Sequence, residues 1–169
     1  MKLPPPTDEN GHLNVVIETP RGSRNKYKKY DEATGLFILG KILPAGSFFP
    51  VDFGFVPGTK AEDGDPLDVM VYTEDALVTG CLAQCRPIGI IQVEQSKNGK
   101  QVRNDRVVAI PTLSKVYEHI CVIDELPKDL VKEWVTFFAY YQQMNGNSFR
   151  ILDIKDGDAA MEAVKKSIS

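Results

Sequence analysis

Runs of hydrophobic residues bounded by Gly, Pro, Asn or Asp predict β-strands over the first two thirds of the chain. The predicted strands cover residues 13–18, 26–30, 36–43, 48–56, 67–72, 81–94 and 106–110. The second and third are close enough in sequence to form a hairpin, and Pro87-Ile88-Gly89 predicts a bulge within the long sixth strand. The Pro-rich residues 1–12 are predicted to form an extended arm, and the polar residues 96–104 a hairpin loop.

Hydrophobic residues in the last third recur with the spacing of an α-helix. A helix start is predicted at Pro127, and Gly146 is predicted to end the helix. The apolar stripe comprises Leu130, Val131, Trp134, Val135, Phe137, Phe138 and Tyr141, and it is typical of a face packed on the core. A short strand over 149–154 and a terminal helix from Asp158 follow. Short strands with two late helices indicate an α+β protein, a small β-barrel with helices packed against it.

Composition indicates one globular domain spanning residues 1–169. Hydrophobic residues make up 43% and charged residues 25% of the chain, values ordinary for a folded, soluble domain. The net charge of -3 argues against nucleic acid or an anionic membrane as partner. No apolar run approaches the roughly 20 residues of a membrane span. Three cysteines, without a CxxC pair, favour buried reduced thiols and a cytoplasmic protein.

The segment Asp63-Gly64-Asp65-Pro66-Leu67-Asp68 places three carboxylates in one short turn, which we call the acidic turn. Like charges this close repel each other unless a cation lies between them. Oxygen ligands suit Mg²⁺, Mn²⁺ or Ca²⁺, and Mg²⁺ commonly joins one or two carboxylates to substrate phosphates. The turn therefore predicts a divalent-metal site associated with phosphate chemistry.

The acidic turn has two other possible interpretations. An EF-hand calcium loop needs Gly at its sixth position and an oxygen ligand at its fifth, where this chain has Asp68 and Leu67, so an EF-hand is rejected. A solvated surface turn is the plainer alternative, because Asp-Gly and Asp-Pro are common turn formers. The turn alone does not separate this alternative from a metal site.

Basic residues elsewhere in the chain are candidates for binding an anion beside the acidic turn. Lys26, Lys41 and Arg106 lie at strand or loop positions that a barrel could bring to one mouth. Taken singly, each of them is more typical of an exposed charge than of a binding residue. Glu18, at the end of an otherwise apolar strand, is similarly ambiguous.

The segment from Asp63 to Val69 resembles the signature of family I soluble inorganic pyrophosphatases, D-[SGDN]-D-[PE]-[hydrophobic]-D-[hydrophobic]. Further segments resemble the family in the same order along residues 13–165. These are Val16-Ile17-Glu18-Thr19-Pro20, Asn25-Lys26-Tyr27, Phe49-Pro50-Val51-Asp52-Phe53-Gly54-Phe55, Cys85-Arg86-Pro87-Ile88-Gly89, Val108-Ala109-Ile110-Pro111 and Tyr117-Glu118-His119-Ile120. The resemblance implies a five-stranded OB-like barrel that hydrolyses pyrophosphate to two phosphates with Mg²⁺.

The same resemblance implies roles for individual residues. Asp63, Asp65 and Asp68 would hold metal, and Asp65 would also help to activate a water molecule as nucleophile. Substrate would be bound by the side chains of Lys26, Lys41, Arg106, Tyr141 and Glu18. Similarity to the short bacterial members implies a homo-oligomer, with a hexamer expected.

Several positions depart from the pattern of the family. Lys28 replaces a usual Glu, Phe49 and Phe53 replace two tyrosines, Asn104 replaces a metal-binding Asp, and Gln142 replaces a Lys. Asp105, next to Asn104, would face the other side of its strand. Together the departures make the implied site about two charges more positive and predict weaker metal binding.

Two functional hypotheses follow. The first is a Mg²⁺-dependent pyrophosphatase, and the intact Asp63, Asp65, Asp68 and Lys26 favour it. The second is a catalytically weakened relative that binds phosphate-type anions or serves as an assembly subunit. Binding of single-stranded nucleic acid by the OB-like barrel is disfavoured, because the chain lacks a stripe of basic and aromatic residues.

Overall fold

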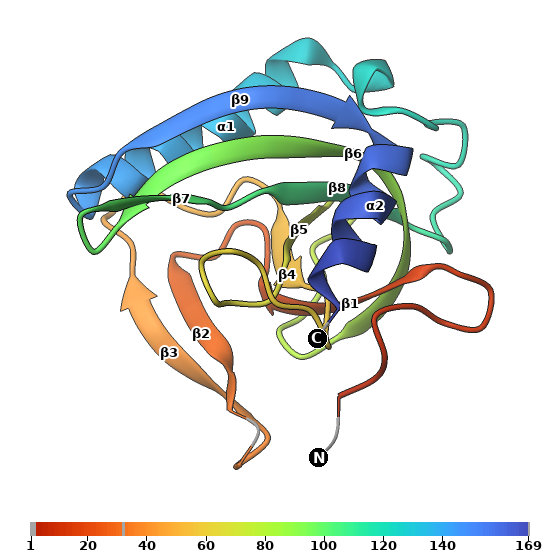
Figure 1. Cartoon of the computed structure of the whole chain (residues 1–169), viewed down its shortest axis with the longest axis horizontal. Helices are drawn as coiled ribbons and strands as arrows, with labels where there is room; N and C mark the ends of the chain where they lie inside the picture. Colours follow the sequence, from red (N-terminus) through yellow and green to blue (C-terminus); the bar gives the residue numbers. More distant parts are fainter. Residues whose placement is uncertain (1–2, 32, 169) are drawn as a thin grey trace.

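A computed structural model describes residues 3–31 and 33–168. Seven strands form one sheet, two form a separate hairpin, and two α-helices and one 3-10 turn complete the fold (Figure 1). The elements are β1 (Leu13–Thr19), β2 (Asn25–Asp31), β3 (Leu36–Ile42), β4 (Asp52–Phe55), β5 (Asp68–Val71), β6 (Leu82–Lys97), β7 (Lys100–Arg103), β8 (Arg106–Pro111), η1 (Ile123–Glu125), α1 (Lys128–Met144), β9 (Phe149–Asp156) and α2 (Gly157–Ser167).

Five strands close into a barrel. The hydrogen-bonded order β1–β4–β5–β8–β6 returns to β1, because β6 also pairs with β1. All of these pairs are antiparallel except β5–β8, which is parallel. The long β6 continues beyond the barrel and pairs with β7 and β9. The structure thus confirms the predicted α+β fold, an OB-like five-stranded barrel with two helices against it.

Two hydrophobic clusters cover the two faces of the barrel strands. One cluster joins Val107 and Ala109 of β8 to Ala160 and Val164 of α2. The other joins Val108 and Ile110 of the same strand to Trp134 and Phe138 of α1. Neighbouring residues of a strand point to opposite faces, so β8 is buried on both sides. Burial on both sides explains why the residues of β8 are continuously apolar. The sequence alone predicted a strand here but not that both of its faces are covered.

Most predicted elements are confirmed, with two changes of extent. The strand predicted over 48–56 is restricted to Asp52–Phe55, where it pairs with both β1 and β5. The loop predicted over 96–104 is instead a strand pair, because β6 extends to Lys97 and β7 runs back from Lys100. The predicted bulge is present as a register shift between Pro87 and Gly89.

The described part of the predicted arm folds back on β1. Asn14 donates from its backbone to the Pro6 carbonyl and from its side chain to the Pro5 carbonyl. Asp8 accepts hydrogen bonds from the backbone and ring of His12. Residues 1 and 2 of the arm lie outside the described part of the chain.

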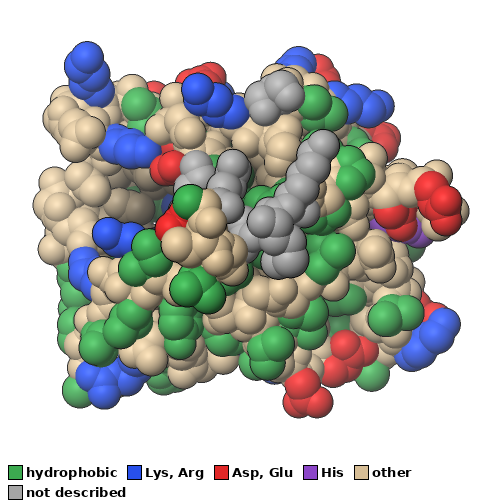
Figure 2. All heavy atoms as spheres, turned by 90° about the horizontal axis from the view of Figure 1, so that it is seen from below, with side chains coloured by type: hydrophobic (Ala, Val, Ile, Leu, Met, Phe, Trp, Pro, Cys, Tyr) green, Lys and Arg blue, Asp and Glu red, His purple; other side chains and the backbone are tan. Residues whose placement is uncertain are grey.

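The β2–β3 hairpin stands away from the barrel and exposes apolar side chains. Its exposed hydrophobic residues are Leu36, Ile38, Leu39 and Ile42, each with about half or more of its surface accessible. Figure 2, which views the molecule from below, shows hydrophobic and charged side chains side by side on this face, with a hollow bordered by charges. Within residues 3–31 and 33–168, no helix is long and apolar enough to cross a membrane.

Gly54 sets how closely β1 and β4 approach each other. A Cβ atom at Gly54 would collide with the backbone oxygen of Val16 and crowd the Cα of Ile17. We predict that Gly54→Ala lowers the free energy of unfolding by about 3 kcal/mol, because the barrel cannot separate the two strands cheaply. Thermal or urea unfolding measures this loss, and unchanged stability would contradict the close approach.

Candidate active site

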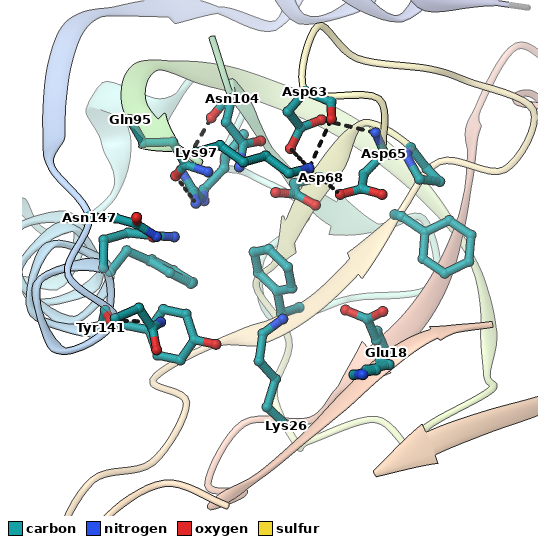
Figure 3. A pocket seen from close by; sticks show the side chains of 18 of the residues that line it. Glu18, Lys26, Asp63, Asp65, Asp68, Gln95, Lys97, Asn104, Tyr141 and Asn147 are labelled. Carbon is teal, nitrogen blue, oxygen red and sulfur yellow. Dashed lines mark hydrogen bonds and ion pairs between the residues drawn. The ribbon is translucent and has the colours of Figure 1, made fainter. Parts of the chain in front are cut away.

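The acidic turn and the predicted basic residues line one cavity of about 430 Å³. Different elements contribute to it: Lys26 comes from β2, Asp68 begins β5, Arg106 begins β8, and Tyr141 lies on α1. Asp68 and Arg106 are direct neighbours in the parallel β5–β8 pair, so the barrel itself places an acid beside a base. Figure 3 shows Asp63, Asp65 and Asp68 on one side of the cavity, with Lys26 and Tyr141 across from them.

Seven of the eight predicted site residues line the cavity directly, and the eighth, Lys41, lies at its edge. The cavity wall includes Glu18, Lys26, Asp63, Asp65, Asp68, Arg106 and Tyr141. Lys41 lies at the edge: its Nζ is 5.3 Å from the centre of the Tyr141 ring and donates to Oδ1 of Asn145, which does line the cavity. Chain segments far apart in sequence therefore meet at one place, as an anion site requires.

The acidic turn is held by its own backbone and by a lysine from β6. The backbone N–H of Asp65 donates to Oδ1 of Asp63 at 3.1 Å, and Gly64 takes a positive φ of 87° that glycine permits. The Nζ of Lys97 lies 2.9 Å from the Asp63 carbonyl oxygen, 3.1 Å from Asp65 Oδ2 and 3.9 Å from Asp63 Oδ2. An ammonium group is thus bound by the oxygens of two of the three aspartates (Figure 3).

Burial shifts the protonation of the two inner aspartates. Loss of solvent raises the pKa of Asp68 to about 6, against the opposing attraction of Arg106 and Lys26. Loss of solvent likewise raises the pKa of Asp63, against the hydrogen bond from Asp65 and the charge of Lys97. For both carboxylates the loss of solvent outweighs the effect of the neighbouring cations, so the pKa is raised.

Arg106 is a buried cation with unused hydrogen-bonding capacity. Only 3% of its surface is exposed. Its guanidinium donates to the Asn104 carbonyl oxygen at 3.2 Å and weakly to Gln95 Oε1 at 3.4 Å, and it lies 4.9 Å from the Phe138 ring. Its Nε is buried and has no hydrogen-bond partner among the described residues. A buried donor without a partner is costly, so the group is suited to an anionic ligand.

All five departures from the family pattern face the same cavity. Lys28, Phe49, Phe53, Asn104 and Gln142 all belong to its wall. Gln142 accepts a hydrogen bond from Asn147 at 3.1 Å, so amides stand where a charged side chain was expected. Asp105 faces away, as predicted, and its carboxylate pairs with Arg103 at 2.7 Å.

Sequence reasoning missed five polar residues of the wall: Gln95, Ser96, Lys97, Asn145 and Asn147. Gln95 and Lys97 were missed because β6 was predicted to end at residue 94. The neighbouring Glu94 lies on the other side of the strand and pairs with Arg150 at 2.7 Å. The dipeptide Asn98-Gly99 was the available signal, since Asn-Gly is typical of a two-residue hairpin turn.

The acidic turn can bind a cation, although its side chains alone do not form a complete set of metal ligands. Among the side chains described, no three from His, Cys, Asp and Glu are close enough together to hold a metal ion. The Lys97 ammonium nevertheless shows that oxygens of Asp63 and Asp65 accept a positive charge. Mg²⁺ needs only one or two carboxylates when water and phosphate supply its other ligands. The residues present therefore fit a divalent cation that takes the place of Lys97.

Comparison with known proteins identifies the class of protein that this fold and cavity define. The sequence model of the family described as inorganic pyrophosphatase matches residues 15–169. The chain therefore belongs to the inorganic pyrophosphatase family, whose members are hydrolases.

Individual relatives agree with this assignment. The inorganic pyrophosphatase of Thermus thermophilus is 34% identical over 93% of this chain and 89% of its own length. That of Synechocystis is 32% identical over 97% of this chain and 94% of its own length. The crystal structure of the Thermus thermophilus protein superimposes with a TM-score of 0.88 over 99% of this chain and 95% of that one. The similarity thus spans nearly whole chains on both sides.

The raised pKa of Asp68 gives the metal-free protein a pH-dependent stability. Below the ordinary value of 3.8 both states carry the proton, and between 3.8 and about 6 only the folded state keeps it. Relative to high pH, the folded state is therefore about 3 kcal/mol more stable below pH 3.8, and it loses this stability as the pH rises through about 6.

We predict that Asp68→Asn removes this part of the decline between pH 4 and pH 7, since an amide does not ionise. Urea unfolding in the presence of a chelator measures it, with the exposed Asp153→Asn as control. An identical pH slope in Asp68→Asn and the unmodified protein would show that Asp68 does not carry the effect.

Proposed function

We propose that this chain hydrolyses inorganic pyrophosphate to two phosphates in the cavity beside the acidic turn, with Mg²⁺ as its metal. The observation that carries the proposal is the meeting of Asp63, Asp65 and Asp68 with Lys26 and Arg106 in one cavity. Carboxylates alone would repel pyrophosphate, and basic side chains alone would bind it without activating water. The combination of the two therefore supports hydrolysis.

The charges of the cavity wall support a requirement for metal. Four carboxylates and four cations line it: Glu18, Asp63, Asp65 and Asp68 against Lys26, Lys28, Lys97 and Arg106. A wall that is close to neutral offers little net attraction to a highly charged anion. Bound divalent cations would supply the missing positive charge.

Asp63, Asp65 and Asp68 would hold the Mg²⁺. The chemistry that Mg²⁺ supplies when bound is to acidify water and to neutralise phosphate oxygens. A carboxylate oxygen of Asp65 accepts the proton of the attacking water. The water oxygen then forms a bond to one phosphorus as the bond from that phosphorus to the bridging oxygen breaks, and the second phosphate leaves.

Basic and hydroxyl groups across the cavity orient the substrate. Lys26 and Arg106 bind phosphate oxygens, and the unpartnered Nε of Arg106 is available for one of them. The Tyr141 hydroxyl donates another hydrogen bond, and Lys41 adds positive charge at the rim. Glu18, also on the cavity wall, completes the predicted set of substrate-binding residues.

We further propose that the chain is a cytoplasmic homo-oligomer, with a hexamer as the expected state. The three cysteines are free thiols, which suits a reducing compartment. The exposed apolar residues of β3 suit burial against further copies of the chain. The net charge of -3 supports a small anion, rather than nucleic acid or a membrane, as the partner.

Asp65→Asn tests the catalytic proposal. We predict that it lowers the rate of phosphate release from pyrophosphate about 10²- to 10⁴-fold at saturating Mg²⁺, because the amide cannot accept a proton. The matched control is Asp153→Asn, which makes the same chemical change at a largely exposed position on β9. Equal rates for Asp65→Asn and the unmodified protein would rule out hydrolysis at this turn and leave the cavity as a binding site.

A gain-of-function variant tests the effect of the departures. We predict that Asn104→Asp combined with Gln142→Lys raises the rate at low Mg²⁺ by about tenfold or more, because it restores a metal-binding carboxylate and a phosphate-binding cation. Steady-state phosphate release over a Mg²⁺ titration measures this gain. A folded double variant with an unchanged Mg²⁺ dependence would mean that the amides are not what limits metal loading.

A further inference from the structure

Lys97 contacts oxygen atoms of the acidic turn that are candidates for binding a divalent cation. Its Nζ contacts the Asp63 carbonyl oxygen at 2.9 Å and Asp65 Oδ2 at 3.1 Å. Nearby, the wall offers the uncharged amides of Gln95 and Asn104, which cannot neutralise an ammonium group. The aspartates are therefore the charged partners that hold the Lys97 side chain in the cavity.

The backbone of Lys97 is fixed by a tight hairpin. Lys97 ends β6 and pairs directly with Lys100 at the start of β7. Between them, Asn98 and Gly99 have positive φ angles of 52° and 76°, as a two-residue turn with a left-handed backbone requires. Since β6 also pairs with β8 and β9, the ammonium is delivered from a strand anchored in the sheet.

A divalent cation and this ammonium cannot share the same oxygens. Two cations within contact distance of one carboxylate repel each other strongly, and the hard oxygens that Lys97 contacts are those that Mg²⁺ prefers. Binding of metal at the oxygens that Lys97 contacts therefore requires Lys97 to leave. The departure is feasible because the Lys97 side chain keeps 40% of its surface exposed and can swing into solvent.

We propose that Lys97 is an intramolecular cation that competes with the divalent metal for Asp63 and Asp65 and thereby sets the metal affinity of the site. This inference rests on the proposed function, because it concerns the same acidic turn. It makes Lys97 a positioning residue for the metal rather than a catalytic residue. In the metal-free protein, the ammonium takes over part of the neutralisation that a metal would provide.

Direct metal binding tests the competition. Calorimetric titration of the full chain with Mn²⁺ and with Mg²⁺ is expected to show that Lys97→Gln binds metal about fivefold more tightly, the order expected for release from a partly exposed ion pair. Lys100→Gln removes the same charge from the same hairpin at an exposed position, and it is expected to change the affinity less than twofold by the general weakness of screened charges. Adding Asp65→Asn to Lys97→Gln is expected to abolish the gain.

Thermal unfolding gives a second readout that does not use activity. With a chelator present, Lys97→Gln is expected to melt below Lys100→Gln, because Asp63 and Asp65 lose their counter-ion. With saturating Mg²⁺ the order is expected to reverse, since tighter binding to the folded state stabilises it more.

Two results would overturn the proposal: Lys97→Gln binding metal no more tightly than the unmodified protein, or Lys97→Gln and Lys100→Gln changing the affinity equally. Failure of the proposed function is seen separately. Tighter metal binding by Lys97→Gln without any release of phosphate from pyrophosphate would refute hydrolysis and leave the competition intact. Phosphate release from pyrophosphate with unchanged metal affinity in Lys97→Gln would refute the competition and leave the proposed hydrolysis intact.

Discussion

The negative charge of the acidic turn has to be balanced by cations that other elements bring to it. Asp68 is built into β5 and cannot move away from the barrel, and burial raises its pKa to about 6. Arg106 stands beside it because β5 and β8 are paired in parallel at these two residues. Lys26 comes from the separate hairpin and Lys97 from the end of β6. The closure of the barrel therefore holds Asp68 in a buried position and also places the positive charge of Arg106 beside it. The hairpin and the end of β6 add the charges of Lys26 and Lys97.

In this chain, lysine ammonium groups and neutral amides surround the carboxylates of the acidic turn. Lys97 binds two of the aspartates, and Gln95, Asn104 and Gln142 supply neutral hydrogen-bonding groups on the same wall. Such a wall has fewer carboxylates for metal than the family pattern implies, so metal would be held more weakly. The acidic turn, Lys26 and Arg106 are retained on this wall, and they are the parts on which the proposed chemistry depends.

Local patterns in the sequence were enough to predict most elements and the acidic turn. The helical stripe of α1 and the hairpin of β2 and β3 follow from spacing between near neighbours in the chain, and both are present. The element pattern indicated a small barrel, and the family resemblance supplied its five-stranded OB-like form and the expected roles of Lys26, Arg106 and Tyr141. The structure brings these three residues to the acidic turn. Such convergence depends on strand pairing between distant segments, which local periodicity does not reveal.

The role of Lys97 was beyond prediction for the same reason. It depends on three residues of extra strand in β6, on the Asn98-Gly99 turn, and on the position of that hairpin relative to residues more than thirty positions earlier. The Asn-Gly pair predicts a turn but not the contact it produces. Asp105 shows the opposite case: alternation between neighbouring residues predicted that it faces away from the cavity, and it does so although it lies in the short connection between β7 and β8.

A crystal structure of the protein soaked in Mn²⁺, with anomalous diffraction data, tests the central claim most directly. The account predicts an anomalous peak bound by oxygens of Asp63, Asp65 or Asp68, with the Lys97 ammonium displaced from Asp65. A fully soaked crystal in which Lys97 stays on Asp65 and no peak lies at the acidic turn would contradict it.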